Sequence, residues 1–294
     1  ERFVDDTIRF IERNKDKPFY VNLWTMLPHA FLHPTDEQMK PYVKFRPGNR
    51  KFKRTSHPYE GVKQVYYASI GDIDKHVGRL MRKVEELRLT ENTVIVFSSD
   101  NGPADINAPN AVHSGIGSTG PFRGRKRSLY EGGIRVPFIV QWKGTIPARK
   151  IDDATVIAGV DWMPTICALA GAKLPKDLNI DGEDMSQALL GNPQKRKKDL
   201  YWEYSNWIPG HTIHKSPTLA IREGKWKLLM NPDGSRKELY NLKTNVSEVD
   251  NVADSNPDVV KRLSEKLLAW KKSIPQVIPH ETAGSSEYPW PKSR

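Results

Sequence analysis

Hydrophobic positions along the chain follow two periods that alternate. Apolar residues at helical spacing predict helices over residues 3–14 and 61–88, the first with Phe3, Ile8 and Ile11 roughly on one side. Short apolar runs predict strands at 19–24, 94–98, 138–142 and 155–158. Strands and helices in this order predict an α/β fold, with a mostly parallel sheet covered by helices.

The pattern changes near residue 192. Short apolar runs at 200–204, 218–222, 226–230 and 239–242 predict strands, and the turn signal Asn231-Pro-Asp-Gly234 joins the third to the fourth. A helix is expected from Asn256-Pro257 onward, carrying Leu263 and Leu267. We therefore expect a large α/β domain over 1–192, a small domain with an antiparallel sheet and one helix over 193–273, and a tail over 274–294.

Composition limits the classes of function. The 294 residues carry a net charge of +11, which suits a polyanionic partner such as a sulfated glycan, nucleic acid or an anionic surface. A basic segment at 40–54 could face substrate or be plain solvated loop, whereas we interpret the run Lys195 to Lys198 as solvated. No nucleic-acid-binding motif is found. No apolar run reaches the roughly 18 residues of a membrane span.

The single cysteine is Cys167, which excludes an internal disulfide framework and a Cys-only zinc site. It lies in an apolar helical pattern over 162–170, with Asp161 as N-cap and Gly171 just beyond the end. We expect Cys167 to serve packing rather than nucleophilic chemistry.

One candidate site follows the strand at 94–98. This strand runs into Asp100-Asn101-Gly102, at the carboxyl end of a strand, where α/β folds bind ligands. A carboxylate and an amide oxygen suit a hard cation, Ca²⁺ or Mg²⁺, better than zinc. A plain turn is the alternative for these residues taken alone.

A second candidate site is a glycine-flanked basic stretch. Lys126 lies between Gly124 and the pair Gly132-Gly133, so a cation occupies a tightly turned segment. Arginines surround it at 123, 125 and 127, and Lys126 is chosen by its spacing to Tyr130-Glu-Gly-Gly133. We expect Glu131 and Arg135 to brace the loop rather than to touch substrate.

These two stretches together resemble the type I sulfatases of the alkaline-phosphatase superfamily. Matching segments continue in order over about residues 1–272: 18–24 with 28–29, 99–102, 124–133, 161–165, 180–184, 189–191, 222–229 and 238–242. The resemblance implies an alkaline-phosphatase-like fold, Ca²⁺ held in part by Asp100 and Asn101, sulfate bound by Lys126, and an active-site histidine at His29. Asn245-Val-Ser247, which fits a glycosylation pattern, stands where the family has Asp-Pro, and we interpret it as a turn.

The expected chemistry fits these residue types. A divalent cation and Lys126 would neutralise the sulfate oxygens, and His29 would protonate the departing sugar oxygen. Other candidates for substrate contact are His113, Arg125, His211 and His214. For each of the three histidines, an exposed loop residue is the competing interpretation.

The largest departure from the family is an absence. Sulfatases convert the Cys or Ser of a Cys/Ser-x-Pro-x-Arg motif to formylglycine, and this sequence has no such motif. Two further metal carboxylates of the family are also missing. We expect both in a preceding segment, which would make these 294 residues inactive alone, and by family habit we expect a periplasmic or secreted protein.

The expected function is hydrolysis of a sulfate ester of a carbohydrate, of galactose or N-acetylgalactosamine type, in a marine polysaccharide or glycosaminoglycan. One alternative is a phosphatase or phosphonate monoester hydrolase of the same superfamily. Another is a non-catalytic binder of polyanions, which would show steep salt dependence without turnover.

Overall fold

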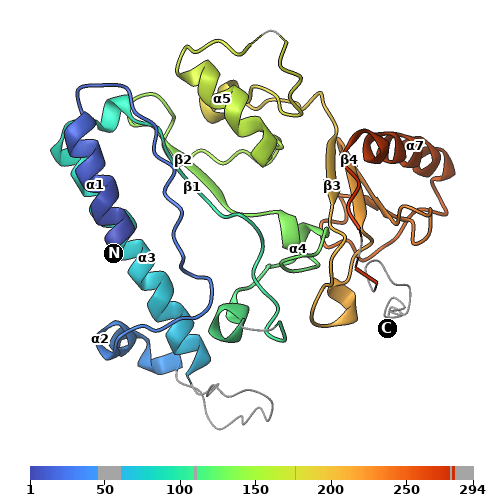
Figure 1. Ribbon diagram of the computed structural model, residues 1–294, viewed down its shortest axis with the longest axis horizontal. Coiled ribbons are helices and arrows are strands. Elements are labelled where there is room, and N and C mark those ends of the chain that lie inside the picture. Colours follow the sequence, from blue (N-terminus) through green and yellow to red (C-terminus); the bar gives the residue numbers. More distant parts are fainter. Residues whose placement is uncertain (46–60, 109–110, 176, 279, 282–294) are drawn as a thin grey trace. The chain divides into compact units, whose positions relative to one another are not determined.

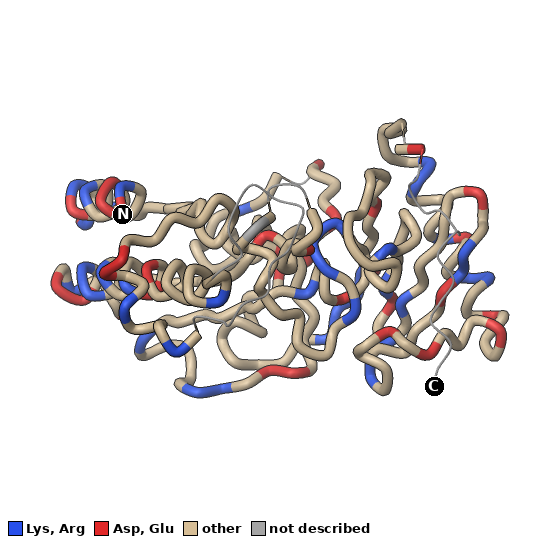
Figure 2. Tube along the Cα trace, turned by 90° about the horizontal axis from the view of Figure 1, so that it is seen from below, with Lys and Arg blue, Asp and Glu red and all other residues tan. Residues whose placement is uncertain are grey.

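The computed structural model describes residues 1–45, 61–108, 111–175, 177–278 and 280–281 (Figure 1). The chain forms two compact units, one of residues 1–93 with 103–118 and the other of residues 94–102 with 119–294. The predicted domain boundaries at 192 and 273 stay predictions. Figure 2 shows Lys and Arg interspersed with Asp and Glu along the trace, so the surplus of positive charge is not confined to one segment.

The first unit is built on two helices, α1 (Arg2–Asn14) and α3 (Val62–Glu86), close to where the periodicity predicts them. The buried side of α1 carries Val4, Thr7 and Ile11, spaced by three and four residues. Phe3, expected on that side, is 53% exposed instead. Two ion pairs join the helices, Arg79 to Asp5 at 2.5 Å and Lys83 to Glu12 at 3.3 Å.

Shorter elements pack along α3. The helix α2 (Asp36–Met39) starts with a capping box in which Thr35 and Gln38 exchange hydrogen bonds. It continues into the 3₁₀ helix η1 (Lys40–Phe45), and η3 (Val112–Ile116) also contacts α3. The 3₁₀ helix η2 (Thr90–Asn92) lies just before the first strand.

The strands predicted at 19–24 and 155–158 are absent, since both segments lack regular secondary structure. Along 19–24 half-buried and exposed side chains alternate, as in an extended chain. A strand also requires a partner for its backbone hydrogen bonds, and no described strand pairs with either segment. The short apolar runs at these two places therefore did not suffice to predict a strand, because they do not specify a pairing partner.

The second unit contains β1 (Ile95–Ser98) and β2 (Phe138–Gln141), both predicted. They pair antiparallel, with Ile95 opposite Gln141 and Ser98 opposite Phe138. The expected mostly parallel pairing is thus wrong for the strand pairs that the structure describes, all of which are antiparallel. Strand order in space depends on which partners meet, which hydrophobic periodicity does not encode.

Three short helical elements follow β2. These are η4 (Gly159–Asp161), α5 (Trp162–Leu169) and α6 (Ser186–Leu189). Gly171 has the left-handed φ of +68° expected just beyond a helix end, and Cys167 is half-buried within α5. Asp161 stands at the N-cap position of α5 but makes no side-chain cap there.

Asp161 instead binds Arg196, which corrects the interpretation of the run Lys195 to Lys198. The guanidinium of Arg196 donates to both oxygens of Asp161, at 2.5 and 2.8 Å; Asp161 is buried and Arg196 is half-buried. Glu183 accepts from the backbone amides of Lys197 and Lys198. The run therefore contains a structural arginine, because a fully buried carboxylate requires a charged partner.

The small sheet agrees with prediction in number and place of its strands. Its order is β3 (Leu200–Glu203), β4 (Leu219–Glu223), β5 (Trp226–Met230) and β6 (Glu238–Asn241), each pair antiparallel, with α7 (Pro257–Ser273) packed on it. Alternate residues of the sheet face α7 and form one core with its Leu263 and Leu267: Leu219, Ile221, Leu228, Met230 and Leu239.

The intervening residues of the sheet form a second core with a segment from elsewhere in the chain. Ala220, Leu229 and Tyr240 pack with Leu129 and Tyr130. The end of the basic stretch, at Leu129 and Tyr130, is therefore packed against the sheet.

Several expectations fall on residues outside the described ranges. Of the basic segment 40–54, only residues 40–45 are described, and they form η1. In the tail, residue 279 and residues 282–294 also lie outside. Within the described part of the chain, no helix is long and apolar enough to cross a membrane.

Candidate functional site

The first candidate element is the turn after β1. Asp100 is exposed, and the side-chain amide of Asn101 donates to the carbonyl of Gly102 at 3.0 Å. That hydrogen bond uses the side-chain nitrogen of Asn101, which leaves its Oδ1 as the side-chain atom that could bind a cation. Ser99 closes the turn by donating from Oγ to the carbonyl of Asn101 at 3.1 Å.

The donor chemistry of this turn fits a hard cation but does not complete a site. Ca²⁺ takes about six to eight oxygen ligands, and Asp100 with Asn101 supplies two kinds of suitable oxygen. Among the described residues there is no group of three or more His, Cys, Asp and Glu side chains placed to hold a metal ion. These two residues can therefore be part of a metal site whose other ligands come from elsewhere.

The second element is the stretch 122–130, which we call the basic loop. Gly124 and Arg127 both have left-handed backbone, with φ of +88° and +78°. The amide of Ser128 donates to the carbonyl of Arg125 at 2.9 Å, which closes a turn around Lys126. Lys126 and Arg125 are half-buried and Arg127 is exposed, so the turn holds three cations close together in sequence.

Three glycines pack the two elements against one another. The amide of Gly102 donates to the carbonyl of Gly133 at 2.9 Å, and the amide of Gly132 donates to the carbonyl of Arg123 at 2.6 Å. A Cβ on Gly102 would overlap the carbonyl of Gly132, and one on Gly132 would overlap that of Gly124. Only glycine permits this approach of backbone to backbone. The structure thus brings the Asp100-Asn101 turn and the basic loop onto one glycine-rich support.

The helical turn α4 (Glu131–Ile134), which contains two of these glycines, rests on a buried ionic group. The ammonium of Lys227, on β5, lies 2.8 Å from Glu131 and 2.9 Å from Glu248. All three residues are at most 2% exposed. Arg135 and Arg222 lie farther from Glu131, at 3.7 and 3.9 Å. Glu131 therefore braces the loop, as the sequence suggested.

Burial and charge act oppositely on the two carboxylates. Burial by itself favours a neutral Glu131, but the positive charge of Lys227 and its hydrogen bond outweigh burial, and the pKa of Glu131 is lowered. Burial is also the largest influence on Glu248; Lys227 opposes it, the negative charge of Glu131 adds to it, and the pKa of Glu248 is raised. With one lysine between two buried carboxylates, the pKa of Glu131 is therefore lowered and that of Glu248 is raised.

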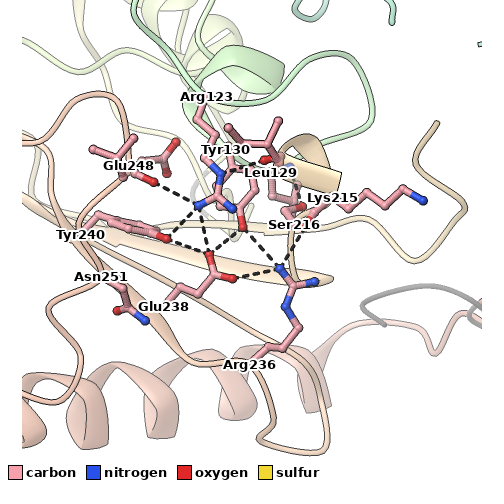
Figure 3. A network of polar contacts seen from close by, with 12 residues as sticks. Arg123, Leu129, Tyr130, Lys215, Ser216, Arg236, Glu238, Tyr240, Glu248 and Asn251 are labelled. Atoms are coloured by element: carbon pink, nitrogen blue, oxygen red, sulfur yellow. Dashed lines mark hydrogen bonds and ion pairs between the residues drawn. The ribbon is translucent and has the colours of Figure 1, made fainter. Parts of the chain in front are cut away.

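Arg123 ties the start of the basic loop to the same surface (Figure 3). Its Nη1 donates to the Tyr240 hydroxyl and to the carbonyl of Glu248, both at 3.0 Å. Its Cζ lies 3.7 Å from the centre of the Tyr130 ring. The Tyr130 hydroxyl donates to Glu238 at 2.6 Å, and burial raises the pKa of Tyr130 well above its ordinary value. Arg123 is therefore a structural residue.

The segment with His211 and His214 is tied to the basic loop by two hydrogen bonds. Arg123 Nε donates to the carbonyl of Ile213 at 2.8 Å, and the amide of Leu129 donates to Ser216 Oγ at 2.9 Å. His211 is exposed and caps η5 (Thr212–His214), with Nδ1 accepting from the amide of Ile213 at 3.2 Å. Nδ1 is then the acceptor, and Nε2 carries the proton of the neutral ring.

His29 and His113 belong to the first unit. His29 is exposed, and its Nδ1 lies 2.9 Å from the carbonyl of Ala30, so Nδ1 donates and Nε2 is left to exchange a proton with a ligand. His113 is half-buried in η3. The roles assigned to both stay predictions.

Sequence reasoning missed Lys227 and Glu248. Lys227 is a single polar residue in the apolar run of β5, and it is separated from Glu131 by 96 residues. Glu248 follows Asn245-Val-Ser247, which was interpreted only as a turn. A fully buried lysine cannot be recognised locally, because its partners are defined by strand register and a distant loop.

Comparison with known proteins defines the family to which the chain belongs. The chain belongs to the sulfatase family, whose profile, described as Sulfatase, matches residues 1–172. A second profile, described as N-sulphoglucosamine sulphohydrolase, C-terminal, matches residues 120–273. The resemblance inferred from the motifs is therefore confirmed.

Individual relatives agree. Human steryl-sulfatase is 32% identical over 211 residues, covering 70% of this chain and 32% of the relative. The N-acetylgalactosamine-6-O-sulfatase of Bacteroides thetaiotaomicron is 29% identical over 280 residues, covering 88% of this chain and 48% of the relative. A crystal structure of Ps i-CgsB superimposes with a TM-score of 0.74 at 26% identity, covering 92% of this chain and 54% of that one.

These matches confirm the alkaline-phosphatase-like α/β class of fold. They also show that the chain spans about a third to a half of the length of the curated relatives it matches.

Proposed function

We propose that this chain is part of a sulfuric ester hydrolase that removes sulfate from a sulfated carbohydrate. The observation that carries the proposal is the glycine support, on which Gly102 and Gly133 join the Asp100-Asn101 turn to the loop of Lys126. Relatives named as sulfatases of N-acetylgalactosamine, and a solved relative in complex with k-i-k-neocarrahexaose at 26% identity, support a sugar of galactose or N-acetylgalactosamine type.

The residues of this chain would act on the anionic group of the substrate. Lys126 would bind sulfate oxygens, and its charge would stabilise the negative charge that develops there as the ester bond breaks. Arg125, His113, His211 and His214 are the candidates for orienting the sugar. His211, with its proton at Nε2, is suited to donate to a hydroxyl or sulfate oxygen.

We further propose Ca²⁺, with Mg²⁺ as the weaker alternative, held in part by Asp100 and Asn101. When bound, the ion would supply fixed positive charge beside the sulfate. His29 would hold the proton at Nε2 that the departing sugar oxygen requires.

A formylglycine nucleophile and the remaining metal carboxylates would come from outside these 294 residues, since the sequence has no Cys/Ser-x-Pro-x-Arg motif. We also propose a periplasmic or secreted location.

The test uses the whole protein with paired aryl sulfate and aryl phosphate esters, followed by sulfated galactose and N-acetylgalactosamine. We expect sulfate hydrolysis in preference to phosphate hydrolysis, loss of activity on chelation, and recovery with Ca²⁺. Asp100→Asn should raise the Ca²⁺ concentration needed for half-activity. The matched control Asp254→Asn, at an exposed position, should not.

Other outcomes would reassign the protein. Faster hydrolysis of the phosphate ester would favour a phosphatase or phosphonate monoester hydrolase. Salt-sensitive binding of heparin without any turnover would favour a non-catalytic binder of polyanions.

A further inference from the structure

Glu248 contacts both ends of the basic loop. Its main-chain carbonyl accepts from Arg123 Nη1 at 3.0 Å, at the start of the loop (Figure 3). Its carboxylate Oε2 accepts from the backbone amide of Glu131 at 2.5 Å, just past the end of the loop. One residue therefore holds residues 123 and 131, and Lys126 lies between them.

The backbone of Glu248 is shaped for these contacts. Its φ of +52° lies in the left-handed region, which is uncommon for a residue with a side chain. Asn245 stabilises the bend, because its carbonyl accepts from the amide of Glu248 at 3.2 Å and its Oδ1 accepts from Val249 at 3.1 Å. The Asn245 side chain also donates to the carbonyl of Asp250 at 2.9 Å. The conformation thus turns the carbonyl and the carboxylate of Glu248 toward the basic loop.

The charge of Glu248 is held by Lys227, which also binds Glu131. Because Glu248 and Lys227 are both 0% exposed, water cannot replace either contact. The amide of Glu131 is the first of α4, and the two glycines that follow it support the Asp100-Asn101 turn. Any shift at this amide would be transmitted to the basic loop on one side and to that turn on the other.

We propose that Glu248 is a positioning residue that fixes the basic loop, so that Lys126 presents its ammonium to the anion. Glu248 does not itself touch substrate. This inference rests on the proposed function for the identity of the anion, sulfate, whereas the fastening of the loop is independent of it.

Two substitutions separate the contacts. Glu248→Gly retains the carbonyl bonded to Arg123 and is favoured by the positive φ, but it removes the carboxylate. Glu248→Gln retains an oxygen that can accept from the amide of Glu131, but it removes the charge and the oxygen that faces Lys227. Lys227 keeps Glu131 as a partner in both, so neither variant leaves an unpaired buried lysine. Glu265→Gln, at an exposed position on α7, is the matched control.

The experiment measures two quantities in the whole protein below its unfolding temperature. Backbone hydrogen exchange over residues 124–131 reports the fastening of the loop. The inhibition constant of inorganic sulfate, together with kcat and KM, reports presentation of Lys126. We expect exchange to rise in the order wild type, Glu248→Gln, Glu248→Gly, and sulfate binding to weaken in the same order, by on the order of ten- to a hundredfold for Glu248→Gly.

The two measurements test the fastening of the loop and the presentation of Lys126 separately. Unchanged exchange in Glu248→Gly would overturn the fastening itself. Faster exchange with an unchanged inhibition constant would overturn the positioning role and leave a structural contact only. If the wild-type protein neither binds sulfate nor hydrolyses its esters, the proposed function fails, and with it the role toward sulfate, while hydrogen exchange still decides whether Glu248 holds the loop.

Discussion

The backbone amide of Gly102 donates a 2.9 Å hydrogen bond to the carbonyl of Gly133. This bond joins the turn that carries Asp100 and Asn101 to the helical turn that closes the basic loop. The two candidate binding elements, separated by more than twenty residues in the sequence, therefore share one backbone support.

Gly102→Ala should disturb this support. The added Cβ would overlap the carbonyl of Gly132, so the two backbones must separate. We expect a loss of about 1–3 kcal/mol in unfolding free energy, as for overpacked cores, and weaker Ca²⁺ binding. Urea denaturation and a Ca²⁺ titration measure the two effects. Gly159→Ala is the control, because a Cβ there meets no atom within 4 Å. Equal behaviour of the two variants would contradict the close packing.

Lys126→Ala should lower kcat/KM for the sulfate ester by roughly 10²-fold or more, the usual effect of removing a charge-stabilising donor. The fold should persist, since Lys126 is only half-buried. Steady-state kinetics on the whole protein measure it, with Arg127→Ala as a neighbouring control and Lys143→Ala as a distant one. A larger loss in Arg127→Ala than in Lys126→Ala would assign the binding of sulfate to Arg127 instead of Lys126.

Lys227→Met should be strongly destabilising, by about 3–5 kcal/mol. It leaves Glu131 and Glu248 buried with their nearest cation gone. Glu248→Gln in the same chain should recover part of the loss, because Glu131 still has Arg222 nearby. Urea midpoints measure the series, and the exposed Lys237→Met serves as control. Unchanged stability in Lys227→Met would mean that the ionic group contributes nothing net.

The attachment of α7 should depend on pH. Burial opposes ionisation of Glu223, but hydrogen bonds from Lys266 and Arg262 outweigh it and lower its pKa below the ordinary 4.5. The same bonding, from Asp199 and then Glu223, raises the pKa of Lys266 above 10.5. Stability from Glu223 is thus present above pH 4.5 and lost as pH falls through its lowered pKa. Stability from Lys266 is present below pH 10.5 and lost as pH rises through its raised pKa.

We therefore expect Glu223→Gln to cost at most about 1 kcal/mol between pH 5 and 10, because these ion pairs are partly exposed. The cost should shrink in acid, where wild-type Glu223 also becomes neutral. Urea midpoints of the two proteins from pH 3 to 8 measure the difference. A constant difference across that range would refute the assignment.

Local pattern determined much of this protein. Helical periodicity located α1, α3 and α7, and short apolar runs located β1, β2 and the four strands of the small sheet. The positions of these elements follow from the order of apolar and polar residues that are close in the sequence, and this order can be read without knowing the tertiary structure. The strands at 19–24 and 155–158 were not formed, because a strand also depends on a partner that periodicity cannot name.

The candidate site divides in the same way. The residue types at Asp100, Asn101 and Lys126 follow from motif and spacing, and the sulfatase family follows from those motifs in order. Only the tertiary structure decided that Gly102, Gly132 and Gly133 pack backbone to backbone, since close approach is a property of distant segments meeting. It alone buried Lys227 between Glu131 and Glu248, because burial selects a charge's partners by position in space and not by position in the chain.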